Sequence, residues 1–129
     1  MKFNKFKLLI CLTLVIVFIV SYSTTAFAAP HLEWCTTAVY YDDGQLVIKG
    51  YFNNNGSTTI DRINSIRLQV YFQRNGSNWW LASIGNWYDL DVYLDPGDSH
   101  YFNLRITNPN YYNFDTWRVV GNFNYHNVN

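Results

Sequence analysis

The stretch from Ser65 to Arg74, SIRLQVYFQR, constrains the fold more than any other part of the sequence. Its apolar residues Ile66, Leu68, Val70 and Phe72 are each separated by one polar or tyrosine residue. Successive side chains of a β-strand point to opposite faces of a sheet, so this alternation predicts a half-buried strand. A helix would scatter the four apolar residues around its circumference. The apolar face of the strand requires a second layer of structure to bury it.

The first 28 residues have the layout of a secretory signal peptide. A basic head with three lysines precedes the apolar run from Leu8 to Val20, and small residues then lead to Ala26-Phe27-Ala28. We expect cleavage after Ala28, which leaves residues 29–129 as a single β-sandwich domain. The exported protein is then secreted or extracellular, with attachment to the cell surface as an option. An uncleaved anchor is the alternative, but the run is shorter than the about 20 residues that span a membrane.

The charge of the exported domain argues against some partners, and its cysteine content argues against an internal disulfide. All nine acidic residues follow residue 28, whereas three of the nine basic residues lie in the head, so the exported domain is mildly acidic. A domain of this charge with no basic cluster is a poor candidate for binding nucleic acid. Cleavage removes Cys11 and leaves Cys35 alone, so no intramolecular disulfide can form. We expect Cys35 to be a buried, inert thiol, with intermolecular pairing as the alternative.

Short alternating segments separated by turn residues predict about seven strands and no helix. Three glycine-containing turns, at Asp43-Gly44, Asn75-Gly76 and Pro96-Gly97, separate several of them, and Gly121 is expected at a bulge or bend. The expected strands cover residues 31–41, 45–53, 65–74, 79–86, 89–95, 100–107 and 117–125. This pattern is typical of an all-β, antiparallel, immunoglobulin-like β-sandwich, and a closed barrel is the main alternative.

The order of these features from Gly44 to Ile106 resembles a known group of bacterial domains. It comprises the strand Gly44–Asn54, an Ile-x-x-Ile step at Ile60 and Ile63, the Ser65–Arg74 strand, and the turn Leu94-Asp95-Pro96-Gly97. In this order the chain resembles secreted sandwich domains of the SLAP type (surface-layer-associated) and of the FxLYD type. The resemblance implies an extracellular, envelope-associated domain without catalysis, and it transfers no catalytic residue.

Residues able to carry catalysis or bind a metal are dispersed along the sequence. The three histidines, His31, His100 and His126, lie far apart, and no hydrolase or zinc-binding motif is present. Asp89, Asp91 and Asp95 are spread along one predicted strand over about 20 Å, so they cannot all surround one calcium ion. A site at the turn between Asp95 and Asp98 is the alternative, and an ordinary polar face is favoured over it. We therefore expect no enzymatic activity, no metal and no cofactor.

Aromatic residues make up 19% of the chain, and many lie close to asparagines. Aromatic rings stack on the apolar faces of sugars, and amides bind sugar hydroxyls. The candidate ring platform for a carbohydrate or another partner comprises Trp79, Trp80, Trp87, Tyr88, Tyr111 and Tyr112. Three further tyrosines on polar faces of predicted strands, Tyr51, Tyr71 and Tyr101, form a candidate contact surface for a protein. Core packing of the tryptophans is the alternative interpretation.

These observations favour a secreted, non-catalytic binding domain that acts at or near the bacterial cell envelope. Its expected partner is a cell-wall component or a secreted protein, with no nucleic acid and no membrane span after cleavage. A polysaccharide-binding module that uses exposed tryptophan and tyrosine is the main alternative. A secreted antimicrobial or toxin-like protein is a more remote one.

Overall fold

A computed structural model describes residues 31–128, which form six β-strands. No helix within this range is long or apolar enough to cross a membrane. The predicted signal peptide lies outside the described residues. The strands are β1 (Leu32–Asp42), β2 (Gln45–Asn54), β3 (Thr59–Gln73), β4 (Trp80–Leu94), β5 (Ser99–Thr107) and β6 (Thr116–Val128).

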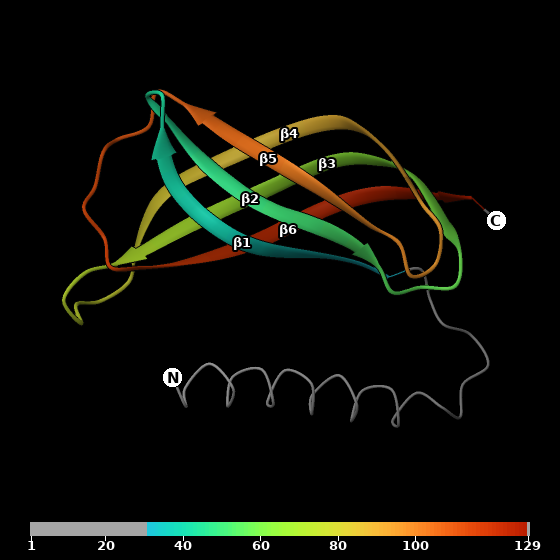
Figure 1. Cartoon of the computed structure of the whole chain (residues 1–129), viewed down its shortest axis with the longest axis horizontal. Coiled ribbons are helices and arrows are strands. Elements are labelled where there is room, and N and C mark those ends of the chain that lie inside the picture. Colours follow the sequence, from blue (N-terminus) through green and yellow to red (C-terminus); the bar gives the residue numbers. More distant parts are fainter. Residues whose placement is uncertain (1–30, 129) are drawn as a thin grey trace.

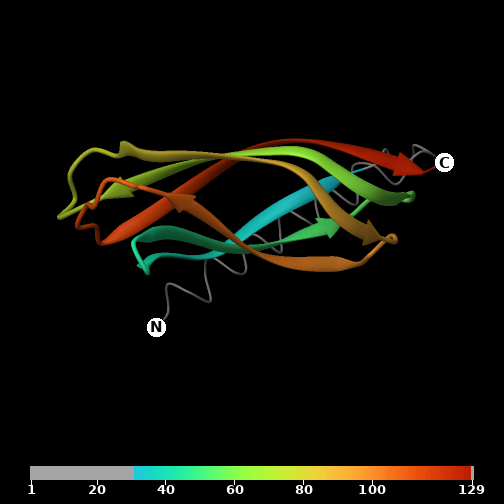
Figure 2. The ribbon, with the colours of Figure 1, turned by 90° about the horizontal axis from the view of Figure 1, so that it is seen from above.

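The strands form two antiparallel sheets that pack face to face (Figure 1). Sheet A has the order β1-β2-β5, and sheet B has the order β4-β3-β6. Figure 2 shows the two layers from the side, with the chain crossing between them after β2, β4 and β5. Such crossings are typical of immunoglobulin-like sandwiches. The predicted antiparallel β-sandwich is therefore confirmed.

The predicted central strand is the middle strand of sheet B, and its apolar face is the centre of the core. Ile66, Leu68, Val70 and Phe72 are at most 1% exposed. Across the sandwich they meet the inner face of β2, where Leu46, Ile48 and Phe52 are fully buried. Burying apolar area of this kind is the main favourable term in folding.

The strand count differs from the prediction because two predicted strands, residues 79–86 and 89–95, are one continuous strand, β4. Its backbone bends at Asp89, which has a positive φ of 52°, a conformation that aspartate tolerates better than most residues. Pairing with β3 continues on both sides of the bend, through Tyr88 with Ser65 and Leu90 with Ile63. The polar residues before the bend therefore belong to the solvent face of a strand and not to a connection.

The turns adopt the geometry that their sequences predict. Asp43 and Gly44 have φ values of 50° and 70°, and Asn75 and Gly76 have values of 51° and 68°. Gly97 has a φ of 90°, and the Asp98 N–H donates to the Asp95 carbonyl at 2.9 Å. The two hairpins among residues 31–128, β1–β2 and β3–β4, lie at the same end of the sandwich (Figure 1).

Of the bulge or bend expected at Gly121, the bulge is absent. Both irregularities in the pairing of β3 with β6, between Ile60 and Arg62 and between Ile63 and Ser65, place the extra residue on β3. β6 itself runs without a bulge. A Cβ at position 121 would lie 3.0 Å from Leu68 Cδ2, so a larger residue there would require the Leu68 side chain to move.

Cys35 is exposed, so the expectation of a buried thiol is also wrong. Adjacent residues of a strand face opposite sides, and the neighbouring Trp34 occupies the inner side. The Trp34 ring packs against the ring of Phe52, with ring centroids 4.8 Å apart, and it covers Gly50. Cys35 therefore lies on the outer face of sheet A, where it pairs with Tyr51 and its hydrogen bond raises the pKa of the Tyr51 hydroxyl.

Asn54 is the only fully buried polar side chain among residues 31–128, and it joins two loops at one end of the sandwich. Its amide nitrogen donates to the carbonyls of Thr58 at 2.8 Å and Leu94 at 2.9 Å. Its amide oxygen accepts from the Gly56 N–H at 3.0 Å. The Asn54 carbonyl accepts from the Gly97 N–H at 2.8 Å. One residue thus holds the β2–β3 loop against the β4–β5 turn.

We predict that Asn54→Ala lowers the free energy of unfolding by about 2 to 4 kcal/mol, because it leaves buried donors and acceptors without partners. Urea denaturation followed by tryptophan fluorescence measures this change. The control Asn103→Ala removes an exposed amide from β5 and should change stability by less than about 0.5 kcal/mol. Equal losses in both variants would contradict the role assigned to Asn54.

Candidate functional site

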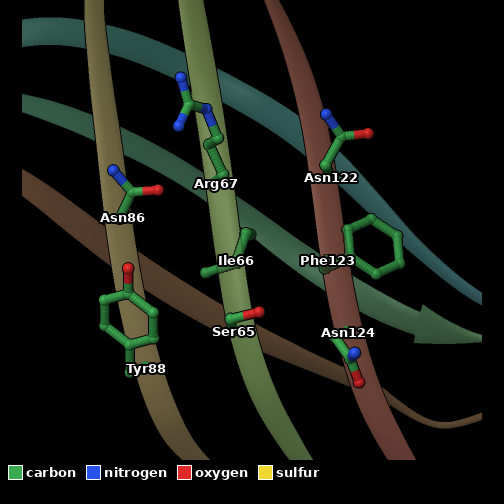
Figure 3. A pocket seen from close by; sticks show the side chains of 8 residues that line it. All are labelled: Ser65, Ile66, Arg67, Asn86, Tyr88, Asn122, Phe123 and Asn124. Atoms are coloured by element: carbon green, nitrogen blue, oxygen red, sulfur yellow. The ribbon is translucent and has the colours of Figure 1, made fainter.

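A shallow hollow of about 370 Å³ lies on the outer face of sheet B (Figure 3). All three strands of the sheet contribute to it, with β3 in the middle and β4 and β6 on either side. We call this hollow the amide groove, and its lining residues are Ser65, Ile66, Arg67, Asn86, Tyr88, Asn122, Phe123 and Asn124.

The polar side chains of the amide groove form two rows across the sheet. Strand register places Asn86 and Asn122 on either side of Arg67 in the first row. It places Tyr88 and Asn124 on either side of Ser65 in the second row. Directly opposed residues of antiparallel strands have Cβ atoms about 5 Å apart. The groove is therefore a compact array of three amides, a guanidinium, a hydroxyl and a phenol ring.

Several of these groups are available to a ligand. Within residues 31–128, the Arg67 guanidinium forms no ion pair, and the side chains of Asn86 and Asn122 form no hydrogen bond. Asn124 accepts one hydrogen bond from Asn64 at 3.2 Å, which leaves its nitrogen free to donate. Tyr88 is 67% exposed and presents its ring beside these groups. The groove thus offers both donors and acceptors together with one exposed ring.

An aromatic platform lies on the same face, toward the β3–β4 hairpin. The Arg118 guanidinium lies over the rings of Tyr71 and Trp79, at 5.1 Å from each ring centroid. Tyr71 is six residues from Ser65 along β3, which corresponds to about 20 Å of strand. Trp79, Tyr71 and Tyr88, three of the predicted site residues, therefore lie on one continuous face.

Three other predicted residues, Trp80, Tyr111 and Tyr112, meet at the end of the sandwich. They line a second hollow of about 570 Å³ together with Arg74, Asn75, Ser77 and Asn113. Their rings also close the core, because Trp80 contacts Phe72 edge-on and Tyr112 contacts both Trp80 and Phe72 in the same way. Trp80 and Tyr112 are thus engaged in packing, whereas Tyr111 is 65% exposed.

The remaining predicted residues lie elsewhere. Trp87 faces the core, where it pairs with Ile66 and its ring covers Gly85, so it does not contribute to an exposed platform. Tyr51 and Tyr101 lie side by side on the outer face of sheet A, with ring centroids 5.2 Å apart. Tyr71 belongs to sheet B, so the three tyrosines do not share one surface. Alternation predicts which side of a strand a residue occupies, but it does not say which sheet the strand joins.

The histidines and carboxylates form separate pairs. His31 Nε2 lies 3.0 Å from Glu33 Oε1, and His126 Nδ1 lies 2.7 Å from Asp61 Oδ1. The hydrogen bond with His126 lowers the pKa of Asp61. His100 packs against the ring of Phe102. In the described part of the chain, no three histidine, cysteine or acidic residues come together to form a metal site.

The amide groove was not predicted, although the sequence contains a signal for it. Asn122 and Asn124 alternate with Phe123 and Tyr125, and Arg67 alternates with the apolar residues of β3. This alternation places the polar groups on the solvent side of their strands. The sequence does not show that β6 pairs with β3, and this pairing is what brings the two asparagines beside Arg67.

Comparison with known proteins gives no family for this chain. No family model matches it, and no curated protein matches it. Among solved structures, it is similar to the Salmonella enterica trimeric lipoprotein SadB, with 10% sequence identity and a TM-score of 0.48 over 92% of this chain and 75% of that one. A likeness at this identity and TM-score carries no functional argument.

The wall of the loop hollow depends on one tyrosine hydroxyl. The Tyr41 hydroxyl donates to the Asn110 carbonyl at 2.8 Å and accepts from the Tyr112 N–H at 3.1 Å. Burial raises the pKa of Tyr41 above its ordinary value. Folding therefore favours the neutral phenol, and this contribution is present below pH about 10 and is lost as pH rises through the folded-state pKa.

We predict that Tyr41→Phe lowers the free energy of unfolding by about 1 kcal/mol at neutral pH. The difference in the free energy of unfolding between this variant and the unmodified protein should become smaller above pH about 10. There the Tyr41 hydroxyl of the unmodified protein ionises, which weakens its hydrogen bonds to the loop. Denaturation at a series of pH values measures both effects. Tyr40→Phe, on the opposite face of β1, is the control, and a loss of the same size there would argue against this role of Tyr41.

Proposed function

We propose that this chain is a secreted, non-catalytic binding domain that acts at the cell envelope and holds a polysaccharide on the outer face of sheet B. The observation that carries the proposal is the amide groove, in which three amides, a guanidinium and an exposed ring converge and only one of the amides, Asn124, is hydrogen-bonded within the fold. The envelope location rests on the predicted signal peptide and on the resemblance to SLAP and FxLYD domains.

The chemistry of the groove suits a ligand that is rich in hydroxyl groups. Each hydroxyl is both a donor and an acceptor, and an asparagine amide complements both roles. Arg67 adds donors that can bind two oxygens at once. The ring of Tyr88 can stack on the apolar face of a sugar.

The shape of the outer face suits a polymer. The amide groove is shallow and open to solvent, and the platform formed by Tyr71, Trp79 and Arg118 lies further along the same face of the sheet. An open groove admits an internal segment of a long chain, whereas a closed pocket would admit only an end or a small molecule. The roughly 20 Å between Tyr71 and Ser65 gives room for several sugar residues.

A second candidate partner is a secreted protein, and the outer face of sheet A favours it. Tyr101 is 72% exposed and packs beside Tyr51, so two adjacent rings are presented on a flat surface. Tyrosine is enriched in protein interfaces. No particular contact supports an antimicrobial or toxin-like activity, which remains a remote alternative.

We predict that the protein is retained on purified bacterial cell wall or on an insoluble polysaccharide, and that Tyr88→Ala or Asn122→Ala lowers the affinity about tenfold, equivalent to about 1.4 kcal/mol. Depletion from solution at a series of polymer concentrations measures the affinity. Tyr93→Ala is the matched control for Tyr88, because Tyr93 lies on the same strand and is 68% exposed. Asn103→Ala is the control for Asn122.

Other outcomes would argue against this assignment. No retention of the unmodified protein on any cell-wall or polysaccharide sample would refute the polysaccharide proposal. Retention that is lost in Tyr111→Ala and kept in Tyr88→Ala would move the site to the loop hollow. Binding of a protein that is lost in Tyr101→Ala would favour the second candidate.

A further inference from the structure

Two of the four edge strands in the described part of the chain, β5 and β6, carry no bulge, and β6 is the longer of the two, with 13 residues against 9. Within residues 31–128, β3 is the only strand that pairs with β6. An edge strand carries a row of unpaired N–H and C=O groups that can pair with another strand, and bulges are one way to prevent this. The edge strand β1 contains an irregularity between Thr36 and Ala38, and β4 has extra residues near Tyr71 and Arg62. β6 has no bulge and no proline over its 13 residues.

The inner side of this edge is incompletely covered. Trp117, Val119 and Phe123 face the core but are only half-buried. The inward residues of β3, in the middle of the same sheet, are at most 1% exposed. The difference follows from position, because a middle strand has neighbours on both sides. An additional strand beside β6 would bury more of the surface of these three side chains.

We propose that β6 pairs with β6 of a second copy of this chain, in antiparallel orientation around a two-fold axis at Val120. The two sheets B would then form one continuous six-stranded sheet. The paired segment is Thr116–Asn124 in each copy. This inference does not depend on the proposed polysaccharide function, because it concerns the backbone edge of β6 and not the groove.

The sequence of the segment is complementary to itself in this register. On the inner side, Trp117 of one copy lies opposite Phe123 of the other, and Val119 lies opposite Gly121. Aromatic and β-branched residues opposite one another stabilise antiparallel pairs. The large rings of Trp117 and Phe123 thus meet, while Val119 lies opposite a residue that has no side chain.

The outer side contains no repulsive pair. Arg118 is the only charged residue of the segment, and it lies opposite Asn122 of the second copy. Val120, which is 42% exposed in the single chain, meets its own copy at the axis. A strand that is its own complement favours a second copy over an unrelated strand, since one surface then supplies both halves of a closed two-fold contact.

We predict that the full chain shows a concentration-dependent rise in mass from monomer to dimer between micromolar and millimolar protein, measured by sedimentation equilibrium without ligand. Val120→Glu should abolish this rise, because it brings two carboxylates together at the axis. Val120→Lys should do the same. A mixture of the two variants should associate again, since opposite charges then meet. Val128→Glu is the matched control, because Val128 is an equally exposed valine, at 45%, on the same strand.

A cross-link tests the register. In a chain with Cys11 and Cys35 both replaced by serine, Val120→Cys should form an intermolecular disulfide under mild oxidation. Directly opposed residues of antiparallel strands have Cα atoms about 4.5 to 5.5 Å apart, which a disulfide can bridge. Val128→Cys should cross-link at least tenfold more slowly, because it lies far from the axis.

Three results would overturn the proposal. They are a protein that stays monomeric up to millimolar concentration, a Val120→Glu variant that dimerises like the unmodified chain, and a charge-swapped mixture that fails to associate. Circular dichroism of each variant separates loss of pairing from loss of folding. Polysaccharide binding by a chain that stays monomeric would leave the proposed function standing while removing this inference.

Discussion

The burial of one face of β3 is the constraint on which the rest of the structure depends. β3 is the middle strand of sheet B, and both β4 and β6 take their position from pairing with it. Its apolar side chains meet the inner face of β2 across the sandwich. Because the side-chain period of a strand is two, burying this face leaves Ser65, Arg67 and Tyr71 on the solvent side. The register of β3 therefore determines both which residues form the core and which residues lie on the outer surface of sheet B.

Most of the fold could be predicted because its signals are local. Alternation and the Asp-Gly and Asn-Gly turns indicate strands and hairpins within a few residues of one another. The continuity of β4 could not be predicted, because Asp89 adopts a left-handed conformation inside a strand while its neighbours stay paired. The exposure of Cys35 follows from competition with Trp34 for the inner side, where the larger apolar ring occupies the core.

The candidate site was harder to predict because it depends on which strands become neighbours. Tryptophan was the most conspicuous residue type, yet Trp87 is part of the core and Trp80 helps to close the end of the sandwich. A small domain needs its largest side chains for burial, which leaves smaller polar residues to form an exposed surface. Asparagine therefore gives the outer face of sheet B its chemical character, while most of the rings serve the interior.

The two ends of the sandwich are closed by different kinds of interaction. At one end the Asn54 amide joins the β2–β3 loop to the β4–β5 turn, while at the other Phe114 stacks on Phe72 with ring centroids 3.9 Å apart. The stacked ring fixes the chain just ahead of β6, and the Tyr41 hydroxyl holds the same connection at Asn110 and Tyr112. Added residues would therefore leave β6 in place only at the start of this connection, before Asn110, whereas the amide-closed end is held to a fixed size.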